Sequence, residues 1–346
     1  MPAPSRHQLT ELLDLDGAGT WLAVAVVTPE GSSVEQVGRS EPDPSSSPER
    51  LFDLASLTKL YTATGVLELA SAAEVGLDHL ASDYLFGDIT RIADCSIRDL
   101  LAHRGGFPPH VLLHELDPFR HDPTAAKLLG RESVLAALVR SAAAARRDRR
   151  DVRMYNNISY VILGEILATK KPWTVANALY ARVGLASTLY NPLQNGWPQR
   201  KIVPTELDDW RPKRCWGEVH DETCYLLDGH AGHAGLFATV SDVAEFTRRW
   251  ITNDPRLHLS PALHSQALAC DGLGIFRTVA EFDPADVEGL PGRALGVTGF
   301  TGTSIWIDTH ANVGCVILTN RIHAGRRMDW IRIVRRTIHG ATFKNR

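Results

Sequence analysis

The alternation of apolar and polar positions predicts strands near the two ends of the chain. An almost unbroken apolar run, TWLAVAVVT, is typical of a buried strand, and the turn residues after it allow the next stretch to return as a hairpin. Three apolar runs near the other end are separated by turn residues and predict an antiparallel meander. The predicted strands are residues 20–28, 33–38, 295–300, 303–308 and 313–320.

Between these strands the apolar positions mostly recur at helical spacing. The predicted helices are residues 7–15, 61–71, 96–103, 131–150, 158–169, 241–250 and 324–339, and a Pro/Ser-rich loop is predicted at 41–48. The order of elements predicts an α/β fold of the α+β type, with an antiparallel sheet built from both chain ends, flanking helices and an inserted helical domain. We expect residues 1–55 and 200–346 to form the discontinuous sheet domain and residues 56–199 to form the helical domain.

The composition is that of an ordinary globular protein of 346 residues with a net charge of −3. This balance gives no general attraction to nucleic acid or to an anionic membrane, and no apolar stretch is long enough to span a bilayer. Residues 1–16 lack the layout of a signal peptide, so we expect a cytoplasmic location. The five cysteines are scattered without a C-x-x-C pair, which argues against a zinc ribbon or a disulfide scaffold.

The stretch that leads into the helix at residues 61–71 holds a serine and a lysine three positions apart, Ser56 and Lys59. Positions i and i+3 share a helix face, so the lysine amine can reach the serine hydroxyl and activate it as a nucleophile. Backbone N–H groups in the first turn of a helix are free to stabilise an oxyanion. The alternative is an ordinary helix N-cap serine followed by a solvated lysine.

A second candidate pair, Tyr155 and Asn157, opens the helix predicted at residues 158–169. Residues two apart in a loop can both point into one cleft. A tyrosine there can carry a proton, and an asparagine can hold a substrate amide or the lysine.

Other polar groups along the chain have structural explanations. We expect His103, which precedes two glycines, to be structural, and the basic run at residues 146–150 to be a solvated helix end rather than an anion site. His230 and His233 are separated by glycines in a loop, a spacing that suits no compact set of metal ligands. The small residues there favour tight backbone packing beside a cleft. We predict no metal and no cofactor, since no phosphate-binding loop motif is present.

Three short motifs follow one another along the chain: Ser56-Leu57-Thr58-Lys59, Tyr155-Asn156-Asn157 and Val297-Thr298-Gly299. In this order they resemble the S-x-x-K, Y-x-N and K/H-T-G motifs of the serine β-lactamase and penicillin-binding-protein superfamily. The likeness is greatest to its class C β-lactamase-like esterases and acyltransferases, and it covers about residues 20–340. It implies a β-lactamase/transpeptidase-like fold and catalysis through an acylated serine.

The resemblance implies a role for each matching residue. Ser56 would be the acylated nucleophile, and Lys59 would activate it and relay its proton. Tyr155 would act as general base or proton shuttle, and Asn157 would position substrate or Lys59. The sequence leaves open which of Lys59 and Tyr155 is the general base.

The third motif would lie on an edge strand beside the substrate. Thr298 and Gly299 would lie beside the substrate, and the oxyanion hole would be the backbone N–H groups of Ser56 and Phe300. Where the family has lysine or histidine, this chain has Val297, which cannot hold a substrate carboxylate. A second x-T-G at residues 300–302 is offset by three positions, so it faces the other side of the strand and is not interchangeable with the first.

These residues predict a serine acyl-transfer enzyme that acts on a small-molecule ester, thioester or amide. The acceptor would be an amine or alcohol, as in a transacylase of natural-product or antibiotic biosynthesis, or water, as in a carboxylesterase or a weak β-lactamase. A third interpretation, supported by Val297, is a non-catalytic binding module of the same fold. No nucleic acid or membrane partner is expected, and the oligomeric state is open.

Overall fold

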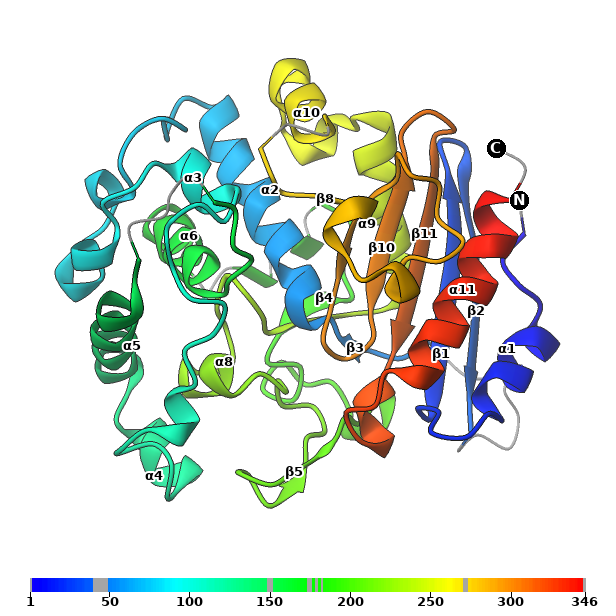
Figure 1. Cartoon of the computed structure of the whole chain (residues 1–346), viewed down its shortest axis with the longest axis horizontal. Coiled ribbons are helices and arrows are strands. Elements are labelled where there is room, and N and C mark those ends of the chain that lie inside the picture. Colours follow the sequence, from blue (N-terminus) through cyan, green and yellow to red (C-terminus); the bar gives the residue numbers. More distant parts are fainter. Residues whose placement is uncertain are drawn as a thin grey trace.

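The computed structural model describes residues 2–39, 49–147, 152–172, 176–177, 180–181, 183–269 and 273–344. Its centre is a six-stranded sheet with the strand order β2-β1-β11-β10-β9-β8, and all of its pairs are antiparallel (Figure 1). The strands are β1 (Trp21–Thr28), β2 (Gly31–Gly38), β8 (Arg277–Thr278), β9 (Leu295–Thr298), β10 (Ser304–Asp308) and β11 (Val313–Thr319).

Strands from the two ends of the chain pair at the middle of this sheet. β1 runs antiparallel to β11, with Ala23 opposite Leu318. The predicted antiparallel sheet built from both chain ends is therefore confirmed, and the five predicted strands are present with shifts of a few residues at their ends. β8 is the strand that the sequence pattern missed, because it is two residues long and carries no alternation.

Two layers of helices cover the sheet, because alternate residues of its strands enter different cores. Leu22, Val24 and Val26 of β1 pack with α1 (Arg6–Leu13) and α11 (Asp329–Phe343). The alternating residues Ala23, Ala25 and Val27 face the larger core with α2 (Thr58–Ser71) and α9 (Val240–Thr252). Figure 1 shows α1 and α11 together on one side of the sheet.

The remaining helices and short strands lie beyond the face that α2 and α9 cover. The helices are α3 (Ile97–Leu101), α4 (Pro123–Leu128), α5 (Arg131–Ala145), α6 (Ile158–Lys170), α8 (Glu222–Leu226) and α10 (Pro261–Ala267). The strands are β3 (Phe52–Asp53), β7 (Leu236–Ala238) and β4 (Thr188–Tyr190), in the order β3-β7-β4, and the ribbon β5 (Leu207–Asp208) with β6 (Lys213–Arg214). Among the described residues, no helix combines the length and the apolarity needed to cross a membrane.

Two predicted helix boundaries are wrong for local reasons. The last helix begins at Asp329 rather than at residue 324, because residues 321–324 form a separate 3₁₀ turn that ends at Gly325 with a φ of 107°. α5 ends at Ala145, and part of the predicted basic tail, residues 148–150, lies outside the described residues. The loop predicted at 41–48 and Cys270 also lie outside them, and the four described cysteines are buried free thiols.

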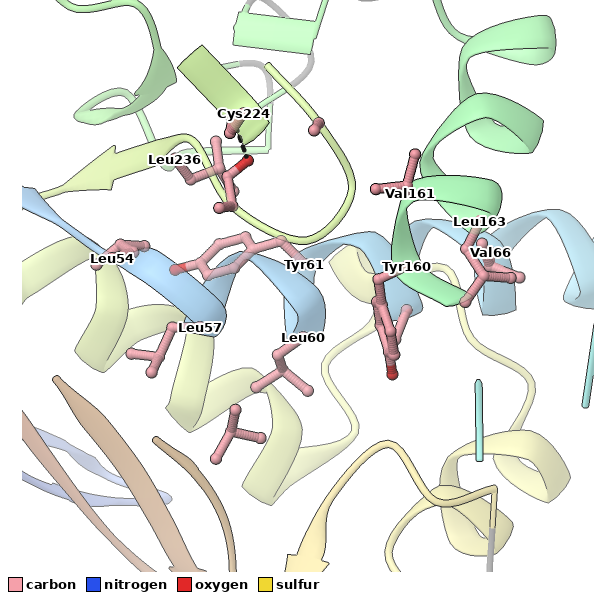
Figure 2. Packing of buried hydrophobic residues seen from close by; sticks show 14 of the residues in the cluster. Leu54, Leu57, Leu60, Tyr61, Val66, Tyr160, Val161, Leu163, Cys224 and Leu236 are labelled. Carbon is pink, nitrogen blue, oxygen red and sulfur yellow. Dashed lines mark hydrogen bonds between the residues drawn. The ribbon is translucent and has the colours of Figure 1, made fainter. Parts of the chain in front are cut away.

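The helix that follows Ser56 is buried on nearly every side, which explains why its sequence is not amphipathic. It packs against α6 within the large core, and β3 leads into it through the 3₁₀ turn of residues 55–57. Figure 2 shows Leu54, Leu57, Leu60, Tyr61 and Val66 along this segment and Tyr160, Val161 and Leu163 on α6. A buried segment of the core thus carries the candidate nucleophile. The division into two domains stays a prediction.

Candidate active site

A single carboxylate fixes the turn that presents Ser56. Ala55 has a φ of 47°, in the left-handed region that costs an L-residue about 1 kcal/mol or more. The buried Asp53 carboxylate accepts the Ala55 N–H at 2.9 Å and the His220 N–H at 2.7 Å. Burial raises the pKa of Asp53, and these two hydrogen bonds lower it in part. The strained turn is therefore held from two directions.

Lys59 lies one turn further along, with 3% of its surface exposed. Its Nζ donates to Ser56 Oγ at 2.8 Å and to the His233 carbonyl at 3.2 Å. The His233 ring is held in turn by Asp221, with 2.9 Å between Nε2 and Oδ1. Burial raises the pKa of Asp221, but the His233 charge and hydrogen bond, together with weaker contributions, outweigh it and leave the pKa well below its ordinary value.

The glycine-rich loop that carries His233 packs tightly between α2 and α6. A Cβ on Gly232 would lie 2.1 Å from the Tyr160 carbonyl oxygen, and Thr62 Oγ1 donates to the Gly232 carbonyl at 2.8 Å. This is the close backbone packing that the small residues predicted. His230 interacts through Nδ1 with the Asp228 carbonyl, so the two histidines of the loop are oriented by different neighbours.

Tyr155 lies against Lys59, so the fold brings the first two motifs together. The Lys59 Nζ is 5.1 Å from the centroid of the Tyr155 ring, and the His103 ring is 4.6 Å from it on centroids. His103 Nδ1 accepts the Asn156 N–H at 3.2 Å, which places the proton of the neutral ring on Nε2. Burial lowers the pKa of His103 well below its ordinary value, as do the positive charges of Lys59 and two arginines. His103 is thus a neutral, buried support for Tyr155.

The two asparagines after Tyr155 have different surroundings, and the predicted role of Asn157 in positioning a substrate stays a prediction. Asn157 is half-buried at the N-cap of α6 and makes no side-chain cap hydrogen bond. Among the described residues, the hydrogen-bond acceptors of Lys59 do not include it. Asn156 is fully buried instead, accepts the Ser159 N–H at 2.8 Å and donates to the Met154 carbonyl at 2.8 Å. Its signal in the sequence is an asparagine three residues before a helical N–H, the pattern of a cap.

The end of β9 presses directly on the Ser56 turn. A Cβ on Gly299 would lie 2.7 Å from the Leu54 carbonyl oxygen and 2.2 Å from Thr303 Oγ1. Thr303 Oγ1 itself donates to that carbonyl at 3.1 Å. Among the described residues, neither the Ser56 N–H nor the Phe300 N–H has a hydrogen-bond acceptor. Two donors without an acceptor therefore belong to segments that touch each other, which is the arrangement that an oxyanion hole needs.

The other residues of the third motif have distinct surroundings. Val297 is buried in the core opposite Ile305, and Thr298 is half-buried at the end of the strand. Thr301, from the second x-T-G, is fully buried and donates to the Asp53 carbonyl at 2.9 Å, so it stabilises the Ser56 turn and does not face a cleft.

Phe300 is 45% exposed, and its ring is 5.4 Å from the His220 ring in a stacked arrangement. The guanidinium groups of Arg321 and Arg326 lie 5.2 and 5.3 Å from its centroid. Arg326 also lines a cavity of about 760 Å³ whose walls include Glu206. Ser56 does not line this cavity, and we place the chemistry at Ser56 because the polar contacts converge there.

The chain is similar to known proteins over most of its length. A model of the Beta-lactamase family matches residues 17–337. A putative D-alanyl-D-alanine carboxypeptidase of Escherichia coli O157:H7 is 28% identical over 79% of this chain and 70% of its own length. An N-acetylmuramyl-L-alanine amidase of Bacillus subtilis is 29% identical over 79% of this chain and 68% of its own length.

Solved structures share the fold at low sequence identity. Simvastatin synthase (LovD) from Aspergillus terreus has a TM-score of 0.66 at 13% identity and covers 98% of this chain and 96% of its own. A D-amino acid amidase from Ochrobactrum anthropi has a TM-score of 0.66 at 16% identity, with 98% and 99% covered. The fold and the family match lead to one conclusion: the chain belongs to the beta-lactamase family of serine acyl-transfer enzymes.

Proposed function

We propose that the protein transfers acyl groups through an acyl-Ser56 intermediate formed on a small-molecule ester or amide. The observation that carries the proposal is the 2.8 Å contact between Lys59 Nζ and Ser56 Oγ. It lies beside two free backbone N–H groups, those of Ser56 and Phe300. A nucleophile, a base and oxyanion donors are the parts that acyl transfer requires.

In the acylation step Ser56 Oγ attacks the carbonyl carbon of the donor. The hydroxyl proton passes to the pair formed by Lys59 and Tyr155, and the carbonyl oxygen gains negative charge between the two N–H groups. The bond to the leaving group then breaks, and the leaving group takes the proton. The reverse sequence with an acceptor breaks the ester to Ser56 and restores the hydroxyl.

We propose an amine or alcohol acceptor, which makes the protein a transacylase of natural-product or antibiotic biosynthesis in the cytoplasm. Val297 supports this, because a buried valine cannot supply the cation with which penicillin-recognising relatives hold a carboxylate at that position. The fold similarity to LovD is consistent with it. Water as acceptor is the second candidate, and the relatives named as a carboxypeptidase and an amidase favour it.

Intact-mass spectrometry after exposure to a fluorophosphonate and to a panel of small esters tests the proposal. An adduct on the wild type that is absent from Ser56→Ala establishes the nucleophile. An acyl adduct that added amines discharge faster than buffer supports transacylation, and rapid discharge in buffer supports hydrolysis. No adduct on either protein contradicts the proposal and favours the non-catalytic binding module.

A further inference from the structure

Val297 leaves the third motif without a positive charge at its usual position. Its side chain is 4% exposed, lies opposite Ile305 of β10 and belongs to the large apolar core. A cation for the cleft has to come from another element.

The next strand outward supplies one. β8 pairs with β9 so that Arg277 lies opposite Gly296, the residue immediately before Val297. The Arg277 guanidinium is 5.1 Å from the centroid of the Tyr155 ring and 3.9 Å from that of Phe282. The Tyr155 ring also lies 5.1 Å from Lys59 Nζ, so one tyrosine neighbours both Arg277 and the lysine that donates to Ser56.

Positive charge exceeds negative charge around this tyrosine. Arg153 and Arg277 share one carboxylate, that of Glu281, at 3.0 Å and 3.7 Å. The same carboxylate accepts the Thr278 N–H at 2.8 Å. Two guanidinium groups thus share one carboxylate, so an anion that comes close to them meets a favourable potential.

The guanidinium of Arg277 retains donors for a ligand. Among the described residues, its hydrogen-bond acceptor is the Glu281 carbonyl, which engages Nη2. The 3.7 Å between Nε and the Glu281 carboxylate is too long for a hydrogen bond. A guanidinium has five N–H groups in a planar fork that matches a carboxylate, and about 20% of this side chain is exposed.

We propose that Arg277 is a specificity-determining residue that binds a free carboxylate on the acyl donor, in place of the cation that Val297 lacks. The proposal rests on the acyl-Ser56 function above and narrows its substrates to acyl donors that bear a second, anionic end. The aromatic rings of Tyr155 and Phe282 hold the guanidinium in place and limit the rotamer entropy lost on binding.

A pair of matched esters tests this directly. Nitrophenyl hexanoate and nitrophenyl hydrogen adipate have acyl chains of equal length, and only the adipate ends in a carboxylate. We expect Arg277→Gln to lower kcat/KM for the adipate roughly 10- to 100-fold, mainly through KM, and to leave the hexanoate within about twofold. Arg277→Lys keeps the positive charge but loses the planar guanidinium fork, so its kcat/KM for the adipate should lie between those of the wild type and Arg277→Gln. Added salt should reduce the wild-type preference for the adipate.

Arg336→Gln is the matched control, since it removes an equal charge from an exposed site on α11. This variant should leave kcat/KM unchanged for both esters. If Arg277→Gln lowers kcat/KM equally for both esters, the arginine only supports Tyr155. That result would overturn the inference about Arg277 and leave the acyl-Ser56 function standing. If neither ester acylates the wild type, the proposed function itself fails.

A second assay asks whether Arg277 binds a carboxylate on the donor or on the acceptor. It measures the rates at which glycine and methylamine discharge hexanoyl-Ser56, since only glycine carries a carboxylate. The donor assignment requires that Arg277→Gln change neither discharge rate. A loss confined to glycine would place the carboxylate on the acceptor and overturn the assignment to the donor.

Discussion

Replacing Gly299 by alanine should disable catalysis at a modest cost in stability. The new Cβ would lie 2.7 Å from the Leu54 carbonyl oxygen and 2.2 Å from Thr303 Oγ1, so β9 must move away from the Ser56 turn. Overpacking of this kind costs about 1–3 kcal/mol. The Phe300 N–H moves with the strand, and one misplaced oxyanion donor lowers kcat by about 10²- to 10³-fold.

Gly292→Ala is the matched control for this change. It lies seven positions upstream, and a Cβ there meets nothing within 4 Å among the described residues. The assays are urea unfolding for the free energy of unfolding and single-turnover acylation of Ser56 with a nitrophenyl ester. Gly299→Ala with wild-type acylation would refute the placement of the oxyanion hole at Phe300, and an equal loss in Gly292→Ala would show that the effect is not local.

Three further changes test the groups around the site. Lys59→Met should abolish acylation yet raise the free energy of unfolding by about 1 kcal/mol, because it removes a buried amine; denaturant titration and intact mass measure both. Burial raises the pKa of Glu206, but hydrogen bonds from His220 and Arg326 outweigh burial and hold the pKa at about 2, below its ordinary value of 4.5. Its stabilisation is therefore complete above about pH 4.5 and is lost as the pH falls toward 2, and Glu206→Gln should lose roughly 2 kcal/mol less than the wild type over that range in acid unfolding. His103→Leu leaves a buried N–H unpaired and should cost about 1–3 kcal/mol in urea unfolding.

Local spacing was enough to predict the Ser56–Lys59 contact. The two residues are three positions apart where the 3₁₀ turn of residues 55–57 runs into α2, so the helical geometry of this short stretch brings them together. The strands at the two chain ends were predictable for the same reason, because the apolar runs that form them are local features of the sequence.

Contacts between distant segments could not be predicted in this way. Asp53 holds the Ser56 turn through the His220 N–H, 167 positions away along the chain, and no local pattern marks that pairing. The carbonyl that binds Lys59 belongs to His233, where the backbone rather than the ring is the ligand. The sequence did not predict Arg277 as a site residue, because its two-residue strand has no periodicity. Its place near the third motif follows from the pairing of β8 with β9.

The surroundings of Lys59 argue against a site that has lost its chemistry. Its hydrogen-bond acceptors among the described residues, Ser56 Oγ and the His233 carbonyl, are both uncharged. A buried amine without a carboxylate in direct contact destabilises a fold, so an apolar side chain of similar length would be better for a module that only binds. A strained Ala55 beside it adds a second cost. Two destabilising features that meet at one hydroxyl are explained by a nucleophile that must be deprotonated, and the opposite signs expected for stability and acylation in Lys59→Met follow from that explanation.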